Sequence, residues 1–201
     1  MGACLDLSAI GPGFSDPDMA SQAVFRRSLE ALSRPGSLIE VDSDAAAPAG
    51  GGAAACALLL ALPDQDTRLW LAPAFSQDAA AYFRFHTGCR ITRVHGEADF
   101  ALVGSVTELP LLQSFRCGSD EYPDHSATLI VEVPHLAIGS GWRIAGPGIR
   151  NEARLSVPAL EKHFPAQWAA NHKRFPRGID VFLTCGALLC GLPRTIQLSE
   201  D

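Results

Sequence analysis

The chain has 201 residues, of which 47% are hydrophobic, and a formal net charge of −6. A chain of this length is expected to form one domain with a sizeable core, because single domains run to roughly 250 residues. The negative charge argues against nucleic acid as the main partner. No apolar run approaches the roughly 18 residues of a membrane-spanning helix, and the N-terminus does not resemble a secretory signal. We therefore expect a cytoplasmic protein that binds neither nucleic acid nor a membrane.

The first elements are predicted from capping residues and periodicity. Residues 1–14 are expected to form a loose N-terminal arm in front of a single domain over residues 15–201. A helix is expected to begin after Ser15, where a capping side chain is followed by proline, and to end at the turn of residues 34–36. Along this helix the residues Phe25, Leu29 and Leu32 recur at spacings of four and three, which predicts one apolar face.

The rest of the chain alternates between predicted strands and helices. Runs of β-branched and aliphatic residues predict strands over residues 37–41, 68–72, 91–94, 98–103, 127–133, 142–145, 179–184 and 195–198. Helices are predicted over residues 53–62 (buried on all sides), 76–85, 110–115 and 157–174 (broken at Pro165), with a short helical turn over 186–190. Residues 42–52, rich in Ala, Gly and Pro, are predicted to form a flexible surface loop. This alternation predicts a three-layer α/β/α fold with a mixed sheet.

A glycine-rich corner follows the strand predicted over residues 142–145. Gly146 and Gly148 flank a proline, so the backbone can adopt a positive φ there and the strand must end. Arg150 follows directly. Because open α/β sheets place polar groups at a crevice beyond their strand ends, this pattern predicts an edge that favours anions.

The common catalytic motifs are missing from the sequence. No phosphate-binding P-loop and no GxGxxG pattern occurs, and the histidines form none of the usual metal-binding spacings. The segment Asp124-His125-Ser126 does not predict a catalytic triad, because neighbouring residues of a strand point to opposite faces. The six cysteines are scattered, and even Cys185 and Cys190 are predicted to be buried thiols. We therefore expect no catalytic residue and no bound metal.

The cationic residues favour anion contact over covalent catalysis. Lys162 and Lys173 are the two lysines of the chain, and both lie in a charged segment, whereas a Schiff-base lysine needs a sheltered pocket. Catalysis with pyridoxal phosphate (PLP) is therefore disfavoured. Arg34, Arg150 and Arg194 are at predicted turns, and arginine is the planar, two-pronged partner of phosphate and phosphonate groups.

Several short segments, in this order along the chain, carry a family resemblance. They are SRPG at 33–36, LPDQDT at 62–67, FRFHTG at 83–88, the stretch from Gly118 through PDHSATL at 123–129, GPGI at 146–149, FPRGIDVFL at 175–183 and LPRT at 192–195. This ordered set resembles PhnH, the H subunit of the bacterial carbon–phosphorus lyase core complex. The resemblance spans nearly the whole chain.

The resemblance implies a fold similar to the large domain of PLP-dependent transferases, but with no cofactor. It also implies a homodimer that joins the G, I and J subunits of the core complex. That complex converts ATP and an alkylphosphonate to ribose 1-phosphonate 5-triphosphate during phosphonate catabolism. The expected role is thus a non-catalytic or co-catalytic subunit. A stand-alone, cofactor-free transferase and a phosphonate- or phosphate-binding protein are the alternatives.

Positions in the matching motifs are the candidates for contact with an anion, a substrate or a partner. They are Arg34, His86, Thr87, Gly146, Gly148, Arg150, Asp180 and Arg194.

Overall fold

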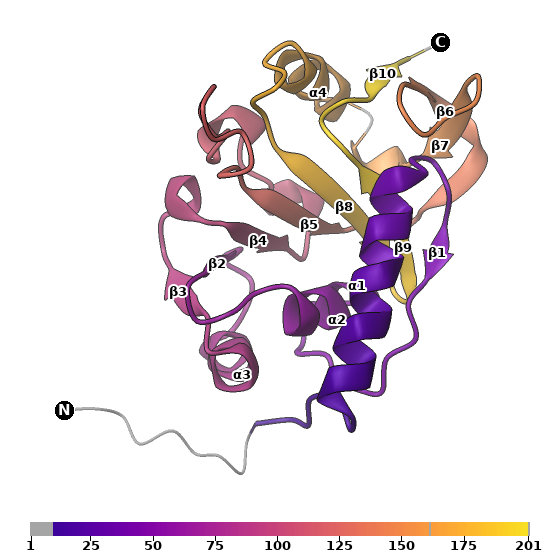
Figure 1. Ribbon diagram of the computed structural model, residues 1–201. Coiled ribbons are helices and arrows are strands. Elements are labelled where there is room, and N and C mark those ends of the chain that lie inside the picture. The colour runs from indigo at the N-terminus through magenta and orange to yellow at the C-terminus, as the bar shows by residue number, and fades with distance from the viewer. Residues whose placement is uncertain (1–9, 161, 201) are drawn as a thin grey trace.

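A seven-stranded mixed sheet forms the middle layer of the computed structural model, which describes residues 10–160 and 162–200 (Figure 1). From one edge to the other its strands are β1 (Ile39–Glu40), β9 (Leu188–Leu192), β8 (Asp180–Cys185), β5 (Thr128–Glu132), β4 (Phe100–Val103), β2 (Arg68–Leu71) and β3 (Arg90–Thr92). The strands from β8 to β3 run parallel to one another, whereas β9 is antiparallel to β8 and β1 is antiparallel to β9. The prediction of an α/β protein with a mixed sheet is confirmed.

Three helices cover one face of this sheet. They are α1 (Pro17–Ser33), α2 (Ala53–Ala61) and α3 (Gln77–Thr87). Alternate strand residues point toward them, including Leu69, Leu102, Ile130 and Phe182, which are at most 2% exposed. The helix α2 is apolar on all sides and its residues 54–59 are buried, as the sequence predicts for residues 53–62. The helix predicted over residues 76–85 is also confirmed as α3, whose N-cap is Ser76 and whose C-cap is Gly88 with a φ of 74°.

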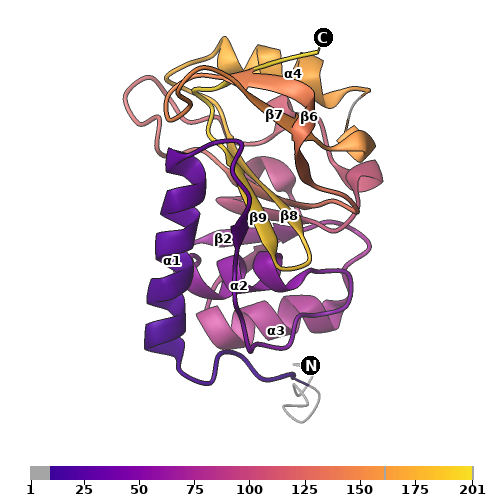
Figure 2. The same cartoon turned by 90° about the vertical axis from the view of Figure 1, so that its right-hand side faces the viewer.

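The other face is covered by a mixed layer rather than by helices alone. Among the described residues it contains α4 (Phe164–His172), four short 3₁₀ helices and a three-stranded antiparallel sheet of β10 (Gln197–Ser199), β6 (Ala137–Ala145) and β7 (Ala153–Ser156). The 3₁₀ helices are η2 (His95–Glu97), η3 (Val106–Glu108), η4 (Leu112–Ser114) and η5 (Pro158–Leu160). The rings of Trp142, Phe164 and Trp168 stack in sequence and join the small sheet to α4. Figure 2 shows α4 at the upper end of the molecule and α3 at the lower end.

Two predicted elements differ from the structure in this region. The helical turn predicted over residues 186–190 is wrong, because residues 188–190 begin β9, which forms a hairpin with β8. The turn is made by Gly186, which has a φ of 60°, and Ala187. The helix predicted over residues 157–174 is divided into η5, which ends at Leu160, and α4, which begins at Phe164, one residue before the predicted break at Pro165. The strand β7 was not predicted.

The face of α1 that packs on the sheet is not its most apolar one. Phe25 and Leu29 are 48% and 51% exposed, whereas Val24, Ser28 and Ala31 are buried. The reason is a close approach between α1 and β9, where a Cβ on Gly191 would lie 2.6 Å from the backbone carbon and oxygen of Ala31. Small residues are needed at such a contact, so the large apolar side chains face outward.

The chain before α1 is fastened to α3 over the residues that the structure describes. His86 Nε2 lies 3.0 Å from the carbonyl oxygen of Gly11, and the Tyr82 hydroxyl donates to the carbonyl of Pro12 at 3.2 Å. Residues 10–14 are therefore not loose as predicted, and residues 1–9 of the predicted arm lie outside the described residues. Within the described ranges, no helix is both long and apolar enough to cross a lipid bilayer.

Candidate functional site

Asp180 and Arg194 form an ion pair at the amino ends of the parallel strands. Asp180 is the first residue of β8, and Arg194 comes two residues after the end of β9. Because β8 and β9 pair with Val181 opposite Leu192, the hairpin register brings the two side chains together. Asp180 accepts from Arg194 Nε at 3.1 Å and Nη2 at 2.5 Å, and the side chains are 21% and 13% exposed. This is a bidentate, mostly buried ion pair.

The guanidinium of Arg194 also holds two loops in place. Its Nη1 donates to the carbonyl oxygens of Pro123 at 2.8 Å and Pro176 at 3.4 Å, and its Nη2 donates to Ser126 Oγ at 2.6 Å. With the bonds to Asp180, all five N–H groups of the guanidinium have acceptors within the chain. Arg194 is therefore built into the loops that carry the motifs PDHSATL and FPRGIDVFL, and a ligand would have to displace one of these contacts.

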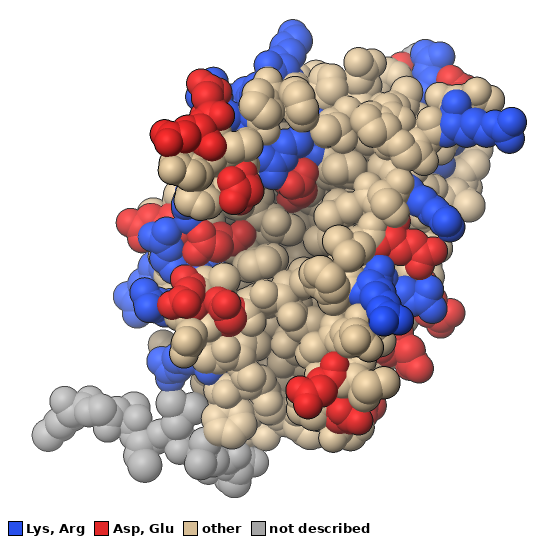
Figure 3. Space-filling model, in the orientation of Figure 1, with Lys and Arg blue, Asp and Glu red and all other residues tan. Residues whose placement is uncertain are grey.

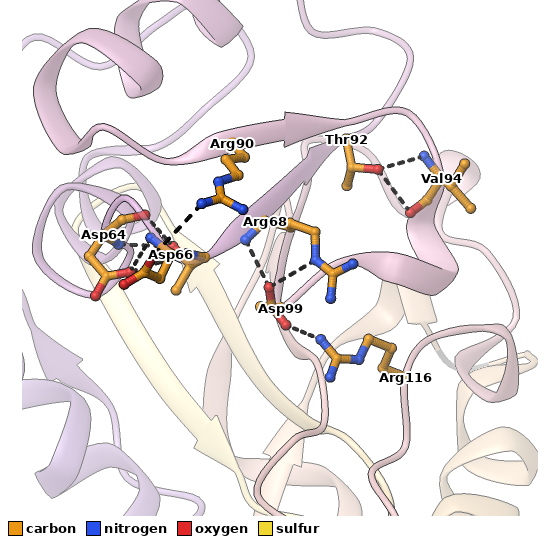
Figure 4. A network of polar contacts seen from close by, with 9 residues as sticks. Asp64, Asp66, Arg68, Arg90, Thr92, Val94, Asp99 and Arg116 are labelled. Atoms are coloured by element: carbon orange, nitrogen blue, oxygen red, sulfur yellow. Dashed lines mark hydrogen bonds and ion pairs between the residues drawn. The ribbon is translucent and has the colours of Figure 1, made fainter.

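A second charged cluster lies on the same edge of the sheet, around Asp99 (Figure 4). Asp99 accepts from the backbone N–H of Arg68 at 2.8 Å and from its Nε at 3.4 Å, and it forms a close ion pair with Arg116. A more exposed pair joins Arg90 to Asp66 at 3.7 Å. Figure 3 shows acidic and basic side chains close together along the left edge of the molecule. Cations and anions thus offset each other at this edge, and no single-sign patch results.

The Gly146–Gly148 corner contacts the SRPG turn directly. A Cβ on Gly148, which has a φ of 85°, would overlap the carbonyl oxygen of Ser33, so this close approach requires glycine. Arg34 caps the end of α1, its side chain is 71% exposed, and Glu30 lies 3.6 Å away. Arg150 is exposed just beyond the corner. The structure therefore brings two motifs with surface arginines to one corner. However, the preceding strand β6 belongs to the small antiparallel sheet, so the corner does not lie at a strand end of the large sheet.

His86 and Thr87 lie far from the other predicted positions. They end α3, at the opposite end of the molecule from α4 and β10 (Figures 1 and 2). The Thr87 hydroxyl donates to the carbonyl of Phe83 at 2.8 Å, and it accepts from the N–H of Cys89 at 3.1 Å. Within the described structure these two residues close a helix end and hold the chain before α1. The eight predicted positions thus form three separate groups, rather than one site.

The carboxyl edge of the sheet holds a carboxylate that the sequence analysis missed. Glu132, at the end of β5, accepts from Thr184 Oγ1 at 2.5 Å and from the N–H of Gly186 at 2.9 Å. A Cβ on Gly52, the N-cap of α2, would overlap this carboxylate, so Glu132 lies against the start of that helix. Helix N-termini favour negative charge, and in layered α/β proteins phosphate groups occupy such places. Here the chain supplies the anion itself.

The thiols of this chain are mostly sheltered. Burial raises the pKa values of Cys56 and Cys190 to about 11, and burial also raises the pKa of Cys89. Cys4 lies outside the described residues. Within the residues that the structure describes, no group of three His, Cys, Asp or Glu side chains has the arrangement of a metal site. Among the described polar side chains at the two edges of the large sheet, those of Arg194, Asp99 and Glu132 hold loops and strands together.

Fold and side-chain network together define an α/β protein whose sequence motifs largely form internal contacts between loops. The chain belongs to the PhnH family, because the family model described as "Bacterial phosphonate metabolism protein (PhnH)" matches residues 12–199. It is 40% identical over 189 residues to a Rhizobium meliloti (strain 1021) protein named alpha-D-ribose 1-methylphosphonate 5-triphosphate synthase subunit PhnH, with 94% of each chain covered. It is also 29% identical over 179 residues to the putative C-P lyase subunit protein HtxG of Stutzerimonas stutzeri, covering 89% of this chain and 85% of the relative.

Proposed function

We propose that the chain is a subunit of a carbon–phosphorus lyase complex. In this role it supports the conversion of ATP and an alkylphosphonate to ribose 1-phosphonate 5-triphosphate in the cytoplasm. The observation that carries the proposal is the identity of 40% over 94% of both chains to a relative named as a subunit of that synthase. The side-chain network agrees with a supporting role, because the Asp180–Arg194 pair joins the motif-bearing loops to each other.

Growth on a phosphonate tests this role directly. A strain that lacks the chain should grow normally on phosphate and should fail to grow on methylphosphonate as the phosphorus source. Growth on methylphosphonate without the chain would refute the proposal. The purified chain should show no turnover of ATP with methylphosphonate by itself, whereas turnover by the isolated chain would favour a stand-alone transferase.

We propose that the chain forms a homodimer and joins sister subunits equivalent to G, I and J. The support is the family membership together with the naming of both relatives as subunits. Light scattering of the purified chain measures its mass, and a mass of one protomer over the accessible concentrations would rule out the homodimer. Co-expression with affinity-tagged sister subunits tests the larger assembly.

We also propose a contact site for an anion or a partner at the corner of SRPG and GPGI. Arg34 and Arg150 are exposed there, so their guanidinium groups are accessible to phosphonate or phosphate oxygens. Titration calorimetry with methylphosphonate and with phosphate, on wild type and on Arg34→Ala and Arg150→Ala, tests anion binding. Unchanged heats in both variants would leave the corner without an anion-binding role.

Finally, we propose that residues 15–201 form a single domain, similar to the large domain of PLP-dependent transferases, that binds no PLP. Two observations support the lack of cofactor binding. The carboxylate of Glu132 lies beside Gly52 at the start of α2, where it would repel a phosphate group. Lys162 and Lys173 are exposed, whereas a Schiff-base lysine needs a sheltered pocket. Adding PLP and recording the absorption of a lysine-linked aldimine tests the proposal, and a saturable band would contradict it.

A further inference from the structure

An open groove runs along α4, at the end of the molecule that is uppermost in Figures 1 and 2. It lies between α4 and residues 106–113 and consists of two adjoining hollows of about 220 and about 780 Å³. Both hollows are lined by Leu111, Ala166 and Gln167, so they form one continuous depression. The predicted site residues do not line it.

The wall and the helix that form the groove are held in fixed positions. Gln167 Oε1 accepts from the backbone N–H of Leu112 at 2.8 Å, which ties α4 to the opposite wall. On the inner side of α4, Trp168 Nε1 donates to the carbonyl of Ile196 at 3.0 Å. Asn171 exchanges two hydrogen bonds with the backbone of Ile179, at 2.9 and 3.0 Å. The groove is therefore a preformed feature of the fold, which lowers the entropy cost of binding.

Most of the exposed surface of the groove is apolar. Leu111 is 57% exposed on one wall, and Ala166 and Ala170, one helical turn apart, are exposed on the other. Phe164 and Leu160, which are both buried, line the larger hollow. An exposed leucine beside small side chains leaves room for the apolar side chains of a bound segment.

The charge around this groove is opposite in sign to the charge of the whole chain. The groove lining includes Lys162, His163 and Arg174, and it includes no Asp or Glu among the described residues. The sequence from residue 162 to residue 179 contains four Lys and Arg residues and no acidic residue, although the chain has a net charge of −6. Two acidic residues flank this stretch: Glu161, which lies outside the described residues, and Asp180, which is paired with Arg194. Two of these cations have described contacts, Arg174 with Cys117 Sγ at 3.2 Å and Arg177 with Asp120 at 3.1 Å. A basic rim on an acidic protein favours an acidic ligand.

We propose that this groove binds an acidic, partly apolar segment of a partner subunit. The proposal rests on the proposed function, since it assigns a surface for contact with the sister subunits. Apolar side chains of the segment would pack on Leu111 and the alanines of α4, and its carboxylates would face Lys162 and Arg174. A second copy of this chain fits less well, because two copies joined through this surface would bring their basic rims together.

Substitutions on the groove and a matched one elsewhere test this assignment. Leu111→Asp places a charge on the wall of the groove, and Lys162→Glu reverses the charge of its rim. Leu29→Asp is the control, because Leu29 is 51% exposed and lies on α1, which covers the other face of the sheet. Each variant is co-expressed with the affinity-tagged G, I and J sister subunits, and its retention is measured by quantitative blotting. Thermal unfolding of each purified variant checks that the fold is retained.

We expect Leu111→Asp and Lys162→Glu to lower retention by about tenfold, and Leu29→Asp to change it by less than about twofold. Retention of the wild type should also fall as salt is added, because the rim contact is electrostatic. Retention of both groove variants at the wild-type level would overturn the inference while leaving the proposed function intact. Failure of the wild-type chain to be retained by any sister subunit would instead refute the proposed function, and the inference with it.

Discussion

Replacing Arg194 with alanine would remove the five hydrogen bonds that its guanidinium donates. The carboxylate of Asp180, which is 21% exposed, would keep the bond from the backbone N–H of residue 194 but lose its counter-charge. Removing one partner of a buried ion pair costs about 3–5 kcal/mol, and partial exposure of Asp180 favours the lower end. We therefore expect Arg194→Ala to lower the free energy of unfolding by about 3 kcal/mol, out of a typical total of about 5–15 kcal/mol.

Urea unfolding followed by tryptophan fluorescence measures this loss, because Trp70, Trp142 and Trp168 are all buried. Arg34→Ala is the matched control. The Arg34 side chain is 71% exposed and has a partner at 3.6 Å, so its removal should change the free energy of unfolding by less than about 0.5 kcal/mol. A double-mutant cycle with Asp180→Ala isolates the pair itself, and we expect a coupling energy of about 2 kcal/mol.

A loss below about 1 kcal/mol for Arg194→Ala, or a loss equal to that of Arg34→Ala, would refute this reasoning. It would mean that the observed bonds contribute little to the folded state. Arg194 would then be available to contact a phosphonate or a partner, as its position in a predicted turn first indicated. The measurement therefore distinguishes a role of Arg194 in stabilising the fold from a role in binding a phosphonate or a partner.

Three further predictions concern the packing and the titrating groups. Gly191→Ala should lower the free energy of unfolding by about 2 kcal/mol, because its Cβ would lie 2.6 Å from backbone atoms of Ala31. An unchanged free energy in urea unfolding would show that α1 is not closely packed on β9. Glu132→Gln should cost about 1 kcal/mol in the same assay, since it removes a negative charge beside the start of α2. Burial raises the pKa of Cys56 to about 11, so the folded state holds the thiol proton more tightly than the unfolded state does. The contribution of this group to the free energy of unfolding is therefore complete below a pH of about 8.5, the pKa of a free thiol, and is lost as the pH rises through 11. At pH 8 in the native state, mass spectrometry should detect alkylation of the partly exposed Cys117 well before Cys56, and equal rates would contradict the burial.

The elements with strong local signals were predictable. The buried helix of residues 53–62 is apolar at nearly every position, and the strand of residues 127–133 lies in the centre of the sheet. Residues 186–190 were not predictable, because a short apolar run does not distinguish a helix from a strand by periodicity. Only the pairing of this segment with β8 decides its conformation.

The face of α1 shows why periodicity can choose the wrong side of a helix. Phe25 and Leu29 have the spacing of a core face, yet the close contact between Ala31 and Gly191 requires the helix to present its smaller residues. That requirement comes from a residue 160 positions away along the chain, since 191 − 31 = 160. The residue pattern of α1 alone therefore cannot predict which face of the helix packs on the sheet.

The candidate positions were found in the motifs, but their grouping was not. Asp180 and Arg194 are 14 positions apart, and only the β8–β9 register makes them a pair. Arg68 and Asp99 likewise meet only because β2 pairs with β4, and no motif indicated either residue. Sequence motifs therefore identified residues that matter to the loops, whereas the strand pairing determines which of them meet.

The carboxylate of Glu132 has a consequence for the start of α2. A phosphate ligand in that place would make the local structure depend on the supply of a metabolite. With its own carboxylate there, bonded to Thr184 and to the N–H of Gly186, the chain supplies negative charge to the helix N-terminus from within. This edge of the sheet therefore needs no bound anion to complete its contacts.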